Sequence, residues 1–336
     1  MTKSKSILRN FMASAWGQRA LIIIVIMIVM AFLQPAFFSF KNLNSILLAI
    51  AIYGIMAGGM MFTVLTGGMD LSVGSMAALT GTILCSSVIN NNYSVSSFFI
   101  GVAVSLVACI VIGILHGTLV SFFGIPAFVI TLATQYGISG VVQILTGGFY
   151  FQPITNGIFY KFGNAKILDV PMPVVLLIIF TIIFAILLSK TTYGKRLFAV
   201  GGNETAAKLV GVKTKLIMIS GYVISSVAAG IGGMILCSMN MQVGTTTAQG
   251  YEGSVLMAII VGGINLAGGE GDIGGAIFGA LLVGIINNIQ VLIGIPGDYQ
   301  KFVQGLIIVV AIILNTYTNR RSRGLTHSRL RGRINT

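Results

Sequence analysis

One acidic residue surrounded by apolar residues is the first candidate for chemistry in this chain. The stretch 67–75 reads GGMDLSVGS and places Asp70 between two apolar segments. A carboxylate in apolar surroundings is costly unless it is paired or hydrogen-bonded. The two preceding glycines favour a helix break, after which Asp70 caps the next helix by accepting from the amide of Val73 or a nearby residue. The alternative is that Asp70 lines a polar path, and the two interpretations are compatible.

Neutral amide side chains form a second group of candidates. Gln135, Asn265, Asn287 and Asn288 lie among apolar neighbours. An amide both donates and accepts hydrogen bonds, so it can bind the hydroxyls of an uncharged solute. It can equally well bond one helix to another. Together with Asp70, these four residues are the candidates for lining a path through the protein.

The motifs of the common catalytic and metal sites are absent from the sequence. It contains no G-x-x-x-x-G-K-[ST] phosphate loop, no H-E-x-x-H and no G-x-S-x-G. Its three cysteines, Cys85, Cys109 and Cys237, lie in apolar segments without metal-ligand spacing. His116 is alone in an apolar segment, and His327 lies among basic residues. We therefore expect no enzymatic activity, no metal and no cofactor bound by this chain.

The composition assigns the chain to the membrane proteins. Hydrophobic residues make up 56% of it and charged residues only 8%, whereas soluble domains carry about 25% charged residues. We expect an all-α polytopic protein lying in the lipid bilayer. The net charge of +13 does not indicate nucleic-acid binding, because the basic residues gather at the chain ends and in one internal loop.

Segments of about 20 apolar residues can cross a membrane as helices, and ten candidates form a single transmembrane domain over residues 1–336. The eighth is short enough to be a half-helix, and eight spans result if two segments are re-entrant. The candidates lie near 20–38, 46–66, 71–89, 97–121, 126–146, 173–189, 215–238, 251–265, 273–293 and 300–318.

The basic residues predict the orientation. Sixteen of the 20 lysine and arginine residues lie in the N-terminal segment 1–19, in residues 190–215 or in the tail 319–336. Because basic loops stay in the cytoplasm, both termini and the loop 190–214 are expected on that side. An even number of spans follows.

A weak internal repeat coincides with the predicted break at Asp70. Residues 67–71 and 262–266 share the pattern G-G-[MI]-[DN]-L, and each precedes a glycine-rich segment. In the predicted topology both lie towards the cytoplasmic side. Duplicated halves and broken helices are frequent in transporters, although a five-residue match in a chain with 43 glycines also arises by chance.

The loop 190–214 is predicted to hold a short helix that docks a partner. Asn203 is suited to cap the helix and Gly211 to end it. Leu209 and Val210 give this helix an apolar side. The alternative is an ordinary ordered loop.

Four motifs in order resemble the ribose-type permease subunits of bacterial ATP-binding cassette (ABC) importers for monosaccharides. The resemblance covers essentially the whole chain. The matching stretches are GGMDLSVGSMAALTG at 67–81, IPAFVITLAT at 125–134, TYGKRLFAVGGNETAAKLVGV at 192–212 and IIVGGINLAGGEGDIGGAIFGALLVGIINN at 259–288.

The resemblance implies a multi-pass protein of the bacterial inner membrane that works with partners. These are two ATP-binding subunits, an extracytoplasmic solute-binding protein and a second permease, identical or different. ATP hydrolysis would occur in the partner chains. The residues that match the motif engaging the ATPase are Gly201, Gly202, Asn203, Glu204, Ala206, Ala207 and Gly211.

One departure from the family and two rival functions remain. The family usually reads Tyr-Glu-Leu-Asp where this chain has Tyr251, Glu252, Gly253 and Ser254. The change puts the transfer of substrate contacts in doubt there and suggests a solute other than ribose. The rivals are a secondary transporter driven by an ion gradient, supported by Asp70, and a permease for branched-chain amino acids.

Overall fold

Helices form nearly all the regular structure in the computed structural model, which describes residues 15–90, 94–151, 157–297, 299–310 and 312–313. The predicted basic tail 319–336 and most of the N-terminal segment 1–19 lie outside these residues. The elements are α2 (Ala15–Leu33), η1 (Pro35–Phe38), α3 (Phe40–Leu65), α4 (Val73–Asn90), α5 (Val95–Phe123), α6 (Ala127–Thr146), α7 (Ile158–Asn164), β1 (Lys166–Ile167), β2 (Val170–Pro171), α8 (Met172–Ser189), α9 (Thr192–Gly202), α10 (Glu204–Leu209), α11 (Thr214–Asn240), α12 (Tyr251–Val261) and α13 (Ile273–Leu292).

Seven of the helices in the described residues are long and apolar enough to cross a membrane, which confirms the prediction of an all-α polytopic protein. They are α3, α4, α5, α6, α8, α11 and α13. Three shorter apolar helices, Ile23–Leu33, Tyr251–Val261 and Tyr299–Val310, fall on the other three predicted spans. The count of ten spans and the side of the termini stay predictions.

Short polar side chains fix where several of the long helices begin. Ser39 caps α3 by accepting from the amide of Asn42, and Ser94 caps α5 in the same way. Asp272 caps α13 through a 2.8 Å bond from the amide of Gly275. Each cap satisfies an amide that has no partner within its own helix, and lipid offers no other partner.

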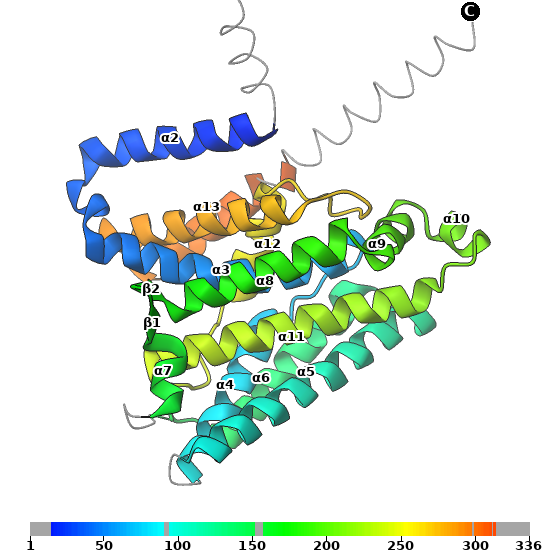
Figure 1. The fold of residues 1–336 in the computed structure, drawn as a ribbon, viewed down its shortest axis with the longest axis horizontal. Helices are drawn as coiled ribbons and strands as arrows, with labels where there is room; N and C mark the ends of the chain where they lie inside the picture. Colours follow the sequence, from blue (N-terminus) through cyan, green and yellow to red (C-terminus); the bar gives the residue numbers. More distant parts are fainter. Residues whose placement is uncertain (1–14, 91–93, 152–156, 298, 311, 314–336) are drawn as a thin grey trace, which may run out of the picture.

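The core of the bundle is built on α3, α4 and α11. The apolar windows of these helices are 72–83% buried, whereas those of α6 and α8 are 17% buried. Figure 1 shows the long helix α11 crossing the whole bundle between α8 on one side and α5 on the other. The helices α6 and α8 therefore leave most of their apolar surface outside the bundle.

Glycine allows α5 and α11 to touch backbone to backbone. A Cβ atom at Gly113 of α5 would lie 2.6 Å from the Cα of Val223, and one at Gly117 would overlap the Cα of Ile219. Both neighbours belong to α11. This small-xxx-small pair therefore packs within the chain, as expected where lipid gives helices no hydrophobic reason to associate.

A small β-hairpin stands at the end of the bundle that holds α7. Strands β1 and β2 pair antiparallel, with Lys166 opposite Pro171 and Ile167 opposite Val170. Leu168 and Asp169 form the turn with positive φ angles of 51° and 62°. We call this end of the molecule the α7 end and the opposite one the α9 end (Figure 1).

The close approach of α5 to α11 predicts that Gly117→Ala lowers the melting temperature of the purified chain in detergent. The added methyl must push Ile219 away, and overpacking of this kind costs about 1–3 kcal/mol. Gly305→Ala is the matched control, because Gly305 is helical and a Cβ there meets nothing within 4 Å. Equal melting temperatures for the two variants would contradict the packing described.

Candidate functional site

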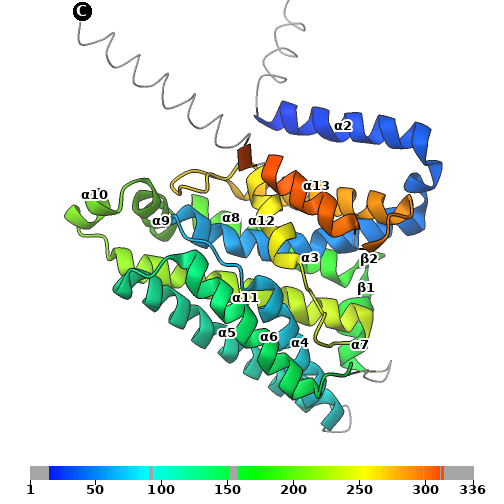
Figure 2. The ribbon, with the colours of Figure 1, turned by 180° about the vertical axis from the view of Figure 1, so that it is seen from behind.

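Two helices begin in the middle of the bundle rather than at one of its ends. Figure 2 shows the chain after α3 running to the middle before α4 starts, and the chain after α11 returning to the middle before α12 starts. Residues 66–72 and 241–250 are therefore non-helical chain inside the bundle. Such chain is tolerated in a membrane only where it is buried in protein or lines a cavity.

A cavity of about 400 Å³ lies where these two helices begin. Its wall combines the first turns of α4 and α12 with one face of α6 and the segment before α12, and hydroxyls and amides predominate. The size and the lining suit a small polar molecule. The lining residues are Gly74, Ser75, Ala78, Gln135, Tyr136, Ser139, Val142, Thr245, Thr247, Ala248, Gln249 and Glu252.

Gln135 is the one predicted path residue on this wall, and Glu252 is the residue that sequence reasoning missed. Glu252 lies in the first turn of α12, directly against Gly74 of α4. Its Oε2 atom is buried and has no hydrogen-bond partner among the described residues. The sequence signal that could have identified Glu252 is an acidic residue in the first turn of a short, otherwise apolar helix. The departure at Ser254 lies elsewhere, because that side chain is buried and interacts with Tyr53.

Asp70 is fully buried behind the cavity and is held by two serines. Its Oδ1 atom accepts from the amide and the hydroxyl of Ser72 at 3.0 and 2.6 Å. Its Oδ2 atom accepts from the hydroxyl of Ser225 on α11 at 2.7 Å. The prediction that Asp70 accepts from the amide of Val73 or a nearby residue is confirmed, and the amide is that of Ser72. Asp70 thereby joins the segment before α4 to α11.

His116 of α5 is packed rather than exposed. It is buried edge-on against the ring of Tyr222, with ring centroids 6.2 Å apart. Neither ring nitrogen has a hydrogen-bond partner among the described residues. The histidine does not line the polar cavity.

The two copies of the sequence repeat make the same local turn. Asn265 Oδ1 accepts from the amide of Ala267 at 3.0 Å, the same two-residue spacing and distance as from Asp70 to the amide of Ser72. The preceding helices both end on a glycine of positive φ, Gly67 at 80° and Gly263 at 81°. Gly67 is the first glycine of its pair, whereas Gly263 is the second glycine of its pair. The two copies of the repeat therefore end their helices one residue apart in the shared pattern.

Asn287 and Asn288 hold helices together. The amide of Asn287 donates to the hydroxyl of Tyr53 at 3.1 Å and accepts from Gln304 at 2.9 Å. Asn288 and Asn42 exchange two hydrogen bonds of 2.8 and 3.0 Å. These contacts tie α13 to α3 and to the helix Tyr299–Val310, away from the residues that line the cavity.

The predicted docking segment forms two short helices at the α9 end. Asn203 caps α10 through a 2.9 Å bond from the amide of Ala206, and Gly211 follows the helix with a φ of 83°. Both features confirm the expected helix. Leu209 and Val210 are 84% and 78% exposed, so the apolar side of α10 faces away from the chain.

The helix α9 rests on both broken-helix loops at once. A Cβ at Gly201 would overlap the carbonyl oxygen of Leu65, the last residue of α3, and would lie 2.5 Å from the amide of Gly269. That amide donates to the same carbonyl of Leu65 at 2.9 Å. Three backbones therefore meet where only glycine fits. We call the contact of Gly201, Leu65 and Gly269 the glycine joint.

The first turn of α9 is also bonded to the bundle. Tyr193 and Ser220 of α11 share a hydrogen bond of 2.8 Å between their hydroxyls. Burial raises the pKa of the Tyr193 hydroxyl above its ordinary value, and the bond to Ser220 lowers it by a smaller amount. The tyrosine is therefore neutral at physiological pH.

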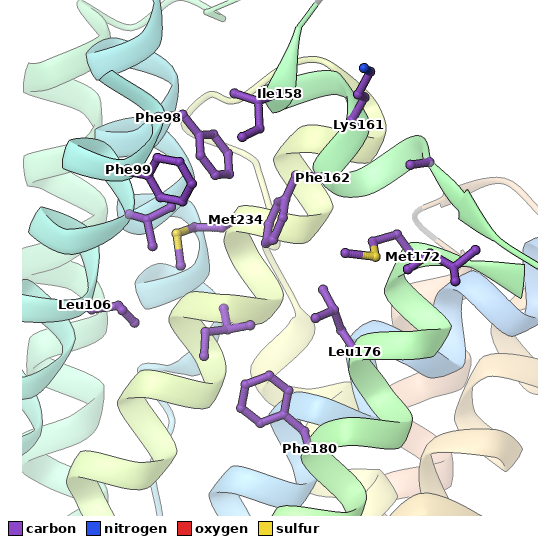
Figure 3. Close-up of a pocket in the computed structure, with 14 residues that line it drawn as sticks. Phe98, Phe99, Leu106, Ile158, Lys161, Phe162, Met172, Leu176, Phe180 and Met234 are labelled. Atoms are coloured by element: carbon purple, nitrogen blue, oxygen red, sulfur yellow. The ribbon is translucent and has the colours of Figure 1, made fainter. Parts of the chain in front are cut away.

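A second cavity, of about 540 Å³, is apolar. Figure 3 shows phenylalanine, methionine and leucine side chains from α5, α7, α8 and α11 around it, with Lys161 at one edge. A hydrophilic solute gains no hydrogen bonds from such a wall. The polar cavity is therefore the better candidate for binding one.

Comparison with protein families matches residues 42–312 to the permease component of the branched-chain amino acid transport system. The chain is 32% identical to the ribose import permease protein of Bacillus subtilis, over 87% of this chain and 89% of that protein. It is 34% identical to the same protein of Escherichia coli, over 91% and 96%. The L-arabinose transport system permease protein of Escherichia coli is 35% identical, over 92% and 93%. No solved structure matches.

The bonds of Asp70 predict that Asp70→Asn destabilises the chain by about 1–3 kcal/mol, because an amide nitrogen replaces one acceptor and leaves a buried donor without a partner. Thermal unfolding in detergent measures the loss. Asp169→Asn is the matched control, since Asp169 lies exposed in the β-hairpin turn. A melting temperature for Asp70→Asn equal to that of the control would refute the structural role assigned to the carboxylate.

Proposed function

The chain belongs to the permease family of the branched-chain amino acid transport system, and from this membership we propose that it is the membrane subunit of an ABC importer for a monosaccharide or similar solute. It is a multi-pass protein of the inner membrane. The observation that carries the proposal is the polar cavity between α4 and α12, in a chain whose relatives are named for ribose and arabinose.

The cavity wall favours a sugar over an amino acid. Its hydrogen-bonding groups are neutral apart from Glu252, and no lysine or arginine is among the lining residues. The carboxylate of a free amino acid calls for a cation or a set of aimed amides. Sugar hydroxyls need only donors and acceptors of the kind that Gln135, Thr247 and Gln249 supply.

An ion-driven carrier is less well supported. Such a carrier would rely on the buried acid Asp70, whose two oxygens are already bonded to Ser72 and Ser225. The sequence contains no phosphate loop, which supports ATP binding and hydrolysis by separate partner subunits. This chain would then bind no cofactor of its own.

The helices α9 and α10 are the proposed docking site for the ATP-binding subunits. The exposed Leu209 and Val210 offer an apolar contact, and the six basic residues of 190–215 lie in or beside these helices, as expected for a cytoplasmic face. The glycine joint passes a movement of α9 to both broken-helix loops. The proposed coupling residues Gly201, Gly202, Asn203, Glu204, Ala206, Ala207 and Gly211 all lie within or beside these helices.

The exposed face of α6 supports a second permease chain as a partner. Tyr136, Ser139 and Gln143 are exposed on this membrane helix, and polar side chains facing lipid are unfavourable. A Cβ at Gly137 or Gly140 would meet nothing within 4 Å, so another helix can approach closely. Because Gln135 and Ser139 also line the polar cavity, the second chain would close it. The solute-binding protein would dock at the α7 end.

The proposal predicts that uptake depends on ATP and on partners. The chain reconstituted alone into vesicles should show no solute uptake, and its assembly with the ATP-binding and solute-binding proteins should show uptake only with ATP. Radiolabelled D-ribose and L-arabinose are the first solutes to test. Uptake by the lone chain along an ion gradient would refute the importer and favour a secondary transporter.

Glu204→Lys should lower ATP-dependent uptake at least about tenfold without preventing membrane insertion, because it reverses a charge in the proposed docking helix. Glu204 also accepts a 3.1 Å bond from Thr214. Thr214→Val removes that bond and keeps the charge, so it separates local structure from docking. Co-purification with the ATP-binding subunit should fall for Glu204→Lys alone. Unchanged uptake in Glu204→Lys would remove the docking role.

A further inference from the structure

Glu252 lies where the first turns of α4 and α12, the two helices that begin in the middle of the bundle, face each other. A Cβ at Gly74, in the first turn of α4, would overlap the Oε2 atom of Glu252 and would lie 2.7 Å from the carbonyl oxygen of Ala248. Gly74 therefore leaves room for the carboxylate between the two helix starts. The positive ends of both helix dipoles lie beside it and favour a negative charge there.

The carboxylate has hydrogen-bonding capacity that the described residues do not use. Oε2 is buried without a partner, although a carboxylate offers about four acceptor positions. A buried acceptor without a donor is costly. Oε2 itself is turned towards Gly74, but Glu252 is part of the cavity wall, so a rotation of its side chain towards the cavity would let a molecule there supply the missing donor.

The surroundings decide which donor fits. Gln135, Ser139, Thr247 and Gln249 share the wall with Glu252 and carry no charge, and no basic residue balances the carboxylate there. The cavity is therefore electronegative. It favours neutral molecules rich in hydroxyls and repels anions at close range.

We propose that Glu252 accepts hydrogen bonds from the hydroxyls of a neutral polyhydroxy solute in the cavity and thereby excludes its carboxylate and phosphate derivatives. The inference rests on the proposed transport function and gives its substrate class. Discrimination against an anionic solute requires a negative charge that repels it, in addition to contacts that bind the neutral solute. Glu252 supplies both with one side chain.

The charge of the cavity can be measured without knowing the solute. Ser139→Cys places a thiol on the exposed wall, while the three native cysteines are buried. The full chain in detergent is treated with a cationic trimethylammonium-ethyl or an anionic sulfonatoethyl methanethiosulfonate. After correction for the rates with a free thiol, the cationic reagent should react about tenfold faster.

Adding Glu252→Gln should bring that ratio close to one, whereas adding Asp169→Asn, which removes an exposed carboxylate elsewhere, should leave it unchanged. A ratio that Glu252→Gln does not move would overturn the proposal, because the carboxylate would then not face the cavity. Should Glu252→Gln fail to fold, Glu252→Asp keeps the charge, draws it back by one methylene, and should still favour the cationic reagent.

Protection of the thiol introduced by Ser139→Cys measures the selectivity. D-ribose, L-arabinose or ribitol at high concentration should slow its labelling, and D-ribonate should not. When Glu252→Gln is added, the concentration of the neutral solute needed for half-protection should rise at least about tenfold, as expected for loss of a bond to a charged group. Protection by D-ribonate equal to that by D-ribose, or no protection by any neutral solute, would overturn the proposal.

The two proposals fail in different experiments. Uptake by the lone chain would refute the proposed importer function, but it would not change the ratio of the two labelling rates in the Ser139→Cys variant. ATP-dependent uptake that is unchanged by Glu252→Gln and fails to discriminate D-ribonate from D-ribose would end only the role of Glu252.

Discussion

A bilayer offers no water to an amide or carbonyl that a helix leaves free, and the centre of this protein is arranged around that constraint. The helices α3 and α12 end inside the bundle, and each is followed by a glycine with a positive φ angle, Gly67 or Gly263. The carbonyl of Leu65, left free at the end of α3, accepts from Gly269 in the loop that follows α12. The loop after α12 thus satisfies a backbone group at the end of α3.

The polar cavity follows from the same interruptions. Because α4 and α12 begin halfway through the bundle, their first turns present Gly74 and Glu252 to a common space instead of to the membrane surface. The side chain of Asp70 then fixes the segment before α4 to α11 through Ser225. The carboxylate of Asp70 serves the structure, and that of Glu252 is left for a ligand.

Hydropathy and local capping rules predicted what depends on neighbours in sequence. Seven long spans, the break at Asp70, the turn at Asn265 and the cap at Asn203 all follow from residues within one or two helical turns. The carboxylate of Asp70 bonds the amide two positions ahead, which is one of the nearby amides that the sequence indicated. Sequence also identified Gln135 as a candidate, and the structure places it on the cavity wall.

The facing of Glu252 and Gly74 was not predictable, because no local pattern brings two distant helix starts together. The segment 241–250 has no hydrophobic period and looks like an ordinary connection between spans. Only its return into the bundle makes Thr247 and Gln249 part of a wall. In the same way, the amides of Asn287 and Asn288 are indistinguishable in sequence from Gln135, and tertiary packing assigns them to helix contacts.

The starting points of α4 and α12 also determine what separates the cavity from the α9 end. Over that half of the molecule, residues 66–72 and 262–272 replace two continuous helices with turns. Turns hold fewer internal hydrogen bonds than helices, so these two loops form a partition with fewer backbone bonds than two helices would make, and Gly67 and Gly268 have positive φ angles within it. Gly201 packs against this partition through its close contacts with Leu65 and Gly269. A passage from the cavity towards the α9 end would therefore have to cross these two short loops and not a long helix.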